Sequence, residues 1–188
     1  MFSLREAKDT FSFIERGLHE VTCKKIEGVN PDYDANKAGY ILVTFEDTTE
    51  EKKNLEVRWY TAKEGTEEEK KKSIGFTMNK ALHLMKIFLT EAQARNLEGK
   101  DFVSFANAMN KSIKTNHVFR IKVTGRAGQD GKVYSTVAFP PFAEQLEDNK
   151  LVYNPNDPND NPLPALSSNK IAGLPQVAAS TSKEDLPF

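Results

Sequence analysis

Three segments in the first third of the chain alternate apolar and polar residues, and this alternation constrains the possible fold most. Residues 17–28 begin and end at glycine, residues 39–47 are rich in β-branched and aromatic side chains, and in residues 54–61 Leu, Val and Trp alternate with Glu, Arg and Tyr. A period of two places successive side chains on opposite faces of a strand. We therefore predict three consecutive strands that pair as an antiparallel meander.

Residues 73–113 change to helical spacing. Between residues 73 and 99 the large apolar side chains recur at helical steps, and Gly99 provides a C-terminal cap. Residues 101–113 repeat apolar side chains every three or four positions behind Asp101, a residue type suited to an N-cap. We predict a long helix followed by a shorter one.

Two further strands are predicted in residues 118–142, joined by a glycine-rich turn that contains the hairpin dipeptide Asp130-Gly131. The order is then three strands, a helical insertion and two strands. We predict a mainly β (α+β) fold, namely a five-stranded OB-fold-like barrel with the helical insertion 73–113 between strands three and four. Other small α+β sheets share this order of elements.

The composition changes near residue 148. Residues 148–182 are rich in Asn, Pro, Ser and Ala without a sustained period, and repeated proline disfavours both helix and central strand. Too little apolar side chain is present to offset the entropy of ordering such a segment. We predict one domain over residues 1–147 and a disordered C-terminal tail, which consists of a flexible linker, 148–182, and a terminal tip, 183–188.

The composition also bears on the compartment. Only 38% of the residues are hydrophobic and 28% are charged, and no apolar run approaches the ~20 residues that span a bilayer. The start of the chain lacks the apolar stretch and cleavage site of a signal peptide, and the lone Cys23 cannot form an internal disulfide. We expect a cytoplasmic protein without membrane contact.

Motifs of catalytic and metal sites are missing from the sequence. The three histidines are far apart, and neither a Cys-x-x-Cys nor a His-Glu-x-x-His spacing occurs. We predict that the protein is not an enzyme, with no catalytic residues, no metal and no cofactor. The alternative is a metal-dependent enzyme, such as a nuclease, that uses carboxylates such as Asp32, Asp34 and Asp47.

The net charge of −1 hides an uneven distribution. The chain has 26 basic and 27 acidic residues, and many of the acids lie in residues 46–51 and 64–69, which we interpret as loops. The remaining body carries a basic surplus. Such a surplus permits binding of a polyanion without requiring it.

Basic and aromatic residues alternate with apolar ones on the predicted strands. If the apolar positions face the core, the intervening side chains lie outside. Exposed rings stack on unpaired bases for about 1 to 3 kcal/mol each, and cations follow the phosphates. The pattern predicts that the residues contacting single-stranded nucleic acid are Arg58, Tyr60, Arg120, Lys122, Lys132 and Tyr134. Trp59 joins them if a strand bulge turns it outwards, since regular alternation buries it. Any half-solvated sheet also shows alternating Arg, Lys and Tyr.

The last residues of the chain combine charge with an apolar end. The tip consists of Glu184, Asp185, Leu186, Pro187 and Phe188. The acids suit a basic rim and the apolar residues suit a pocket, while the proline stiffens the segment before binding and so lowers its ordering cost. We predict that this tip docks onto partner proteins.

These residues resemble the acidic tip of bacterial single-stranded DNA-binding proteins, which end in an Asp-rich stretch and Ile-Pro-Phe after a disordered linker. The strand at residues 17–21, the strand at residues 39–45, the helix at residues 74–97 and the closing strand Gly-Lys-Val-Tyr-Ser-Thr-Val-Ala-Phe also resemble bacteriophage-encoded proteins of this kind. Here Leu186 replaces the usual Ile, two acids precede it, and the helical segment is longer than in the bacterial proteins.

The resemblance implies a protein that coats single-stranded DNA through an OB barrel. Its tip would recruit replication, recombination or repair enzymes, and it could act as a homo-oligomer in the cytoplasm, or in that of the host cell if a phage encodes it. The alternative from another class is a protein–protein adaptor without DNA binding, whose domain and tip bind two different proteins.

Overall fold

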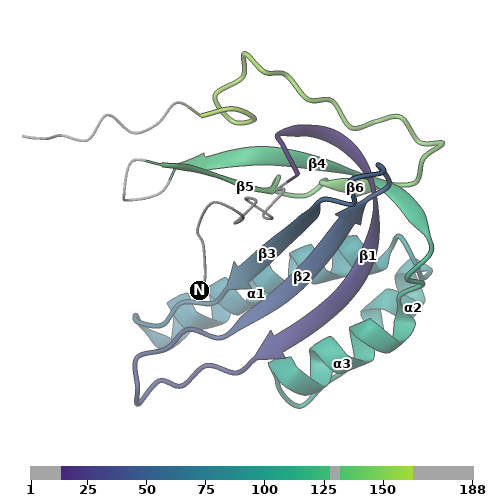
Figure 1. The fold of residues 1–188 in the computed structure, drawn as a ribbon. Helices are drawn as coiled ribbons and strands as arrows, with labels where there is room; N and C mark the ends of the chain where they lie inside the picture. Colours follow the sequence, from purple (N-terminus) through teal and green to yellow (C-terminus); the bar gives the residue numbers. More distant parts are fainter. Residues whose placement is uncertain (1–13, 128–131, 163–188) are drawn as a thin grey trace, which may run out of the picture.

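The computed structural model describes residues 14–127 and 132–162 (Figure 1). The turn with Asp130-Gly131 and the tip Glu184 to Phe188 lie outside the described residues. The strands are β1 (Gly17–Val29), β2 (Tyr40–Asp47), β3 (Asn54–Tyr60), β4 (Val118–Ala127), β5 (Val133–Val137) and β6 (Ala143–Glu144). The helices are α1 (Glu67–Met85), α2 (Glu91–Arg95) and α3 (Phe102–Ser112).

The strands form one antiparallel six-stranded sheet in the order β3-β2-β1-β4-β5, and β6 adds to β4. The mainly β fold and the helical insertion between the third and fourth strands are therefore confirmed. β1, β2 and β3 form the predicted meander, and β4 and β5 form the predicted final pair. The two-residue β6 was not predicted, because it is too short for a period of two to be recognised.

The predicted OB-fold-like barrel is not closed in the described residues. β1 pairs through its first half with β4 and through its second half with β2, and a bulge between Cys23 and Lys25 lies where it changes partner. The sheet therefore curls, but no described hydrogen-bond ladder joins β3 to β5. β5 ends at Val137, and Pro140 and Pro141 follow it. Proline has no N–H to donate, so these residues cannot extend the ladder.

The helical segment begins earlier and divides more than predicted. Thr66 and Glu69 form a capping box that begins α1, so part of the acidic stretch 64–69 belongs to a helix where we expected a loop. The acids suit the positive end of the helix dipole. Thr90 and Gln93 form a second capping box, which starts α2 and splits the predicted helix 73–99. α3 begins behind Asp101 as predicted. None of the helices in the described part is long and apolar enough to cross a membrane.

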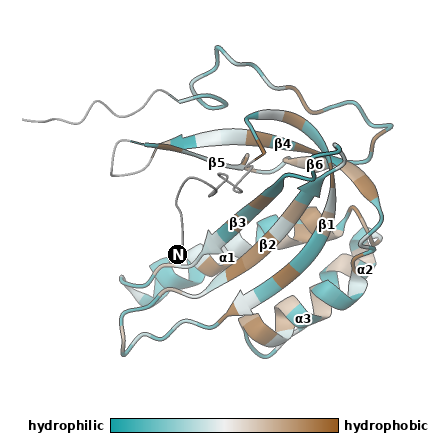
Figure 2. Ribbon diagram, in the orientation of Figure 1, coloured by the Kyte–Doolittle hydropathy of each residue, from teal (hydrophilic) through white to brown (hydrophobic). Residues whose placement is uncertain are grey.

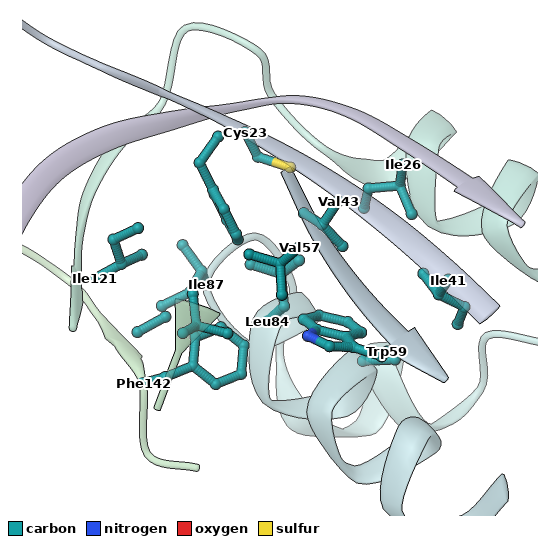
Figure 3. Packing of buried hydrophobic residues seen from close by; sticks show 14 of the residues in the cluster. Cys23, Ile26, Ile41, Val43, Val57, Trp59, Leu84, Ile87, Ile121 and Phe142 are labelled. Atoms are coloured by element: carbon teal, nitrogen blue, oxygen red, sulfur yellow. The ribbon is translucent and has the colours of Figure 1, made fainter. Parts of the chain in front are cut away.

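The core lies between the concave face of the sheet and the helices. Inward residues of β2 and β3 are buried in pairs, such as Val43 opposite Val57 and Ile41 opposite Trp59. Figure 3 shows Trp59 and Val57 together with Leu84 of α1 and Phe142. Apolar and polar residues alternate along the strands in Figure 2, as a half-buried sheet requires.

α3 is held close to β1 by hydrogen bonds between asparagine side chains and backbone N–H groups. The side-chain oxygen of Asn30 accepts a hydrogen bond from the backbone N–H of Phe102 at 2.9 Å, and the side-chain oxygen of Asn110 accepts one from the backbone N–H of Ile26 at 2.9 Å. At Gly28 the two elements approach so closely that a Cβ would overlap the carbonyl oxygen of Phe102. Glycine is therefore required at this position.

The segment 148–162 packs on the sheet, so the flexible linker does not begin at residue 148 as predicted. The buried Glu144 carboxylate accepts hydrogen bonds from the backbone N–H groups of Lys150 and Leu151 at 2.7 and 2.9 Å. The buried Asp160 carboxylate accepts one from the backbone N–H of Asn154 at 2.8 Å. Carboxylates thus satisfy backbone donors in a segment that has few apolar side chains. Residues 163–182 of the predicted linker lie outside the described residues.

Replacing Gly28 with alanine should lower the free energy of unfolding by about 1 to 3 kcal/mol, because the new methyl group overpacks the contact between β1 and α3. Gly75→Ala is the control, since nothing lies within 4 Å of a Cβ at this α1 position. This control should raise the free energy of unfolding by about 0.5 to 1 kcal/mol. Urea denaturation measures both changes, and equal effects of the two substitutions would contradict the packing.

Stability should also fall in mild acid because of His83. Its Nε2 accepts hydrogen bonds from the backbone N–H groups of Phe142 at 3.1 Å and Ala143 at 3.2 Å. Burial lowers the pKa of His83 below its ordinary value of 6.5, and the nearby Lys86 contributes to this shift. As the pH falls through 6.5, His83 therefore becomes protonated in the unfolded chain, while in the folded protein it takes up its proton only at lower pH.

The free energy of unfolding should consequently decrease between about pH 7 and pH 5, above the range in which carboxylates titrate. His83→Gln retains an acceptor that does not titrate there, so it should remove most of this decrease. Urea midpoints measured across the range provide the test. An equal pH slope in the variant would assign the effect to another group.

Candidate nucleic-acid interface

A cleft of about 470 Å³ lies between the open edges of β3 and β5. It brings together three of the seven residues predicted to contact nucleic acid, Arg58, Tyr60 and Tyr134. The complete lining is Glu56, Val57, Arg58, Tyr60, Arg126, Ala127, Tyr134, Ser135 and Thr136. The opening of the sheet is thus also the place where these three predicted residues meet.

The two tyrosines of the cleft are held by their strands with half of each side chain in solvent. Tyr60 and Tyr134 are each 52% exposed, because alternation turns them away from the core. The ring of Tyr60 lies against that of Tyr40 on β2, with 5.3 Å between the ring centroids. The carbonyl of Tyr60 accepts a hydrogen bond from Thr77 Oγ1 of α1 at 3.2 Å. Tyr60 is therefore fixed in position while one part of it stays accessible.

Two arginines supply positive charge to the cleft. Arg58 is exposed and its guanidinium lies 3.5 Å from the carboxylate of Glu56, which is also exposed. Such a surface ion pair contributes little to stability. Arg126 forms no ion pair with any other residue in the described part of the chain. Both guanidinium groups can therefore bind an anion at small cost.

Arg126 is the cleft residue that the sequence prediction missed. The register pairs it with Tyr134, so its strand position is directly beside a predicted residue. Arg120, Lys122 and Arg126 share one parity along β4. Continuing the same alternation four residues further would have found it. Lys132 is exposed and stands two positions before Tyr134, outside the lining of the cleft.

Arg120 and Lys122 are not part of this cleft. Arg120 lies 3.0 Å from the buried Glu144 and also donates to the side chain of Asn149 at 2.7 Å. Lys122 Nζ lies 2.6 Å from the buried Asp160. Both cations are half-buried under residues 143–162 and neutralised by them. The prediction that they form an open basic surface is therefore wrong, because acids distant in the sequence pair with both of them.

Trp59 is in the core. It is 2% exposed and packs against Phe142, with 5.8 Å between the ring centroids. The register between β2 and β3 is regular, so no bulge turns the indole outwards. Trp59 is thus inaccessible to a base, and regular alternation predicted its position correctly.

The carboxylates considered for a metal-dependent enzyme do not converge. Asp32 shapes the loop between β1 and β2, where its side chain accepts a hydrogen bond from the backbone N–H of Ala35 at 3.1 Å. Asp34 lies in the same loop, whereas the buried Asp47 ends β2 and accepts from the backbone N–H of Lys53 at 2.9 Å. Within residues 14–127 and 132–162, no three side chains of the metal-binding types gather as a ligand set.

Two other features differ chemically from the cleft. Burial raises the pKa of the Cys23 thiol to about 12, so it stays protonated at neutral pH. A hollow of about 1050 Å³ lies between α1 and α3, where Ile74, Met78 and Phe105 make its walls largely apolar. Neither feature suits a polyanion as the cleft does.

Comparison with models of known protein families finds no match to this chain. Comparison with curated proteins finds none either. Its function is therefore inferred from its own residues.

Trp59 is the only tryptophan of the chain, so its fluorescence tests the placement directly. We expect emission typical of a buried indole and weak quenching by acrylamide, because its exposed fraction is 2%. Unfolding in urea should restore quenching to the level of free tryptophan, which serves as the control. Strong quenching in the native protein would place Trp59 at the surface.

Proposed function

We propose that this chain is a non-enzymatic protein that binds and coats single-stranded DNA without sequence preference. The observation that carries the proposal is the cleft between β3 and β5, with Tyr60, Tyr134, Arg58 and Arg126 around one opening. Rings for bases and cations for phosphates are the two components of such binding.

Stacking supports single-stranded over double-stranded DNA. Every base has an aromatic face, but the bases of a duplex already stack on each other, and the half-exposed rings of Tyr60 and Tyr134 require an unpaired base. Each stacked base contributes about 1 to 3 kcal/mol. Since stacking accepts all four bases, the binding would be independent of sequence.

The arrangement of the sheet supports an open variant of the OB-fold. β1 lies between β2 and β4, and the helices connect β3 to β4, which is the order expected for that fold. OB-folds are partly open barrels that bind oligonucleotides on the face of the second and third strands and with the loops beside it. The cleft includes β3 and the β4–β5 hairpin, so it adjoins these regions.

Recruitment of partners would be the task of the terminal tip. We propose that Glu184 to Phe188 docks onto replication, recombination or repair proteins, with the acids at a basic rim and Leu-Pro-Phe in a pocket. In this view the protein works in the cytoplasm, or in that of the host cell if a phage encodes it.

The test is the binding of fluorescent oligo-dT and of a matching duplex, followed by anisotropy. We expect tighter binding of the single strand than of the duplex. Tyr60→Ala and Tyr134→Ala should each weaken single-strand binding about 5- to 150-fold, which corresponds to the loss of one stacked base. Arg58→Ala and Arg126→Ala should each lower the salt slope, by about 0.7 for every phosphate contact removed.

Tyr33→Ala is the matched control. Tyr33 is 43% exposed, like the cleft tyrosines, but it lies in the β1–β2 loop and contacts Lys70. Its loss should leave DNA affinity unchanged. Equal effects of all three tyrosine substitutions would reject the cleft as the site. Failure of the wild-type protein to bind oligo-dT at low salt would reject the function and favour the adaptor.

A further inference from the structure

Two exposed phenylalanines meet where α1 passes the residues that follow β5. Phe76 on α1 is 46% exposed and Phe139, which follows β5, is 66% exposed. Their rings make an edge-on contact with 6.3 Å between the centroids. Large apolar side chains so exposed leave a considerable area in water, which favours a ligand that covers them.

A lysine shares one face of α1 with Phe76. Lys80 stands one helical turn after Phe76 on α1, so the two share a face of the helix. Burial lowers the pKa of Lys80, and so does the positive charge of Arg126. Neither cation forms an ion pair with any residue in the described ranges. An anion bound beside Lys80 would supply it with a partner of opposite charge.

This group is linked to the cleft through α1, which is hydrogen-bonded to the end of β3. Thr77, which lies between Phe76 and Lys80 in the sequence, is hydrogen-bonded to the carbonyl of Tyr60 at 3.2 Å. Ser73 Oγ accepts a hydrogen bond from the backbone N–H of Ala62 at 2.7 Å, which also ties α1 to the end of β3. α1 therefore runs beside the end of β3 that carries Tyr60.

We infer that Lys80, Phe76 and Phe139 form a second binding position for the same strand, in which Lys80 holds a phosphodiester and the two phenylalanine rings contact a base. We call this group the α1 position. It rests on the proposed function and adds a path to it, since the strand would leave the sheet at Tyr60 and continue along α1.

The inference predicts that the α1 position matters only for strands long enough to reach it. A short oligonucleotide would occupy the cleft between β3 and β5 alone. A longer one would occupy both positions and gain affinity from the second. The substitutions that remove the α1 position should therefore act on long strands and spare short ones.

The experiment compares oligo-dT of increasing length, from about 4 to 16 nucleotides, the range of site sizes found for OB-folds. Phe139→Ala and Lys80→Gln are the variants. Phe139 is well exposed, so its loss should not affect folding, and glutamine keeps much of the half-buried stem of Lys80 while removing its charge. Thermal unfolding checks that both variants remain folded.

The comparison starts from the shortest strands that the wild-type protein binds. For these strands we expect both variants to have the wild-type affinity. For the longest strands we expect both variants to lose at least fivefold in affinity. Lys80→Gln should also lower the salt slope on long strands by about 0.7, as expected for one phosphate contact. Lys71→Ala is the control. Lys71 is an exposed cation nine residues before Lys80 on α1, so it lies on the side of the helix opposite to Lys80. It should bind all lengths like wild type.

Three outcomes would overturn the inference. Unchanged affinity of both variants for long strands would show that no contact is made on α1, while the proposed function stands. Equal losses for short and long strands would place these residues in the first position and not in a second one. A wild-type protein that binds no oligo-dT would reject the proposed function and the α1 position together.

Discussion

The double pairing of β1 is the constraint on which the rest of the structure depends. Its first half bonds to β4 and its second half to β2, so both parts of the sheet are joined through one strand (Figure 1). The bulge between Cys23 and Lys25 lies at the change of partner, where bulges increase the bend and twist of a strand. Because β1 bends, β3 and β5 end as two free edges of one curled sheet, and the helices cover its concave face.

The open edges of β3 and β5 explain why basic and aromatic side chains gather in one cleft. Edge strands face water, and charged residues there prevent pairing with other chains. Arg58 meets that requirement on the edge of β3, and the curl of the sheet brings it into a common cleft with Tyr60 and Tyr134. The charge that protects this edge would thus also serve the proposed binding of single-stranded DNA. The inferred second position lies on α1, which Thr77 ties to the end of β3.

Much of the fold could be read from local patterns, and some local signals were overlooked. Alternation located β1, β2 and β3 to within about one residue of their bounds, and Asp101 marked the start of α3. The division of the long helix was also readable, since Thr90 with Gln93 is a capping box, as is Thr66 with Glu69. The packing of residues 148–162 on the sheet could not be read from local patterns. It depends on the carboxylates of Glu144 and Asp160, which accept hydrogen bonds from backbone N–H groups outside helices and strands.

The sequence by itself determined which side chains share a face of each strand, because alternation is a property of the local backbone. It therefore predicted the outward direction of Tyr60 and Tyr134 and the inward direction of Trp59. Only the tertiary structure decided which outward residues stay accessible. Arg120 and Lys122 have the parity of Arg126, yet Glu144 and Asp160 neutralise the first two and leave the third at the cleft. That choice depends on contacts between segments far apart in the chain, which no local period encodes.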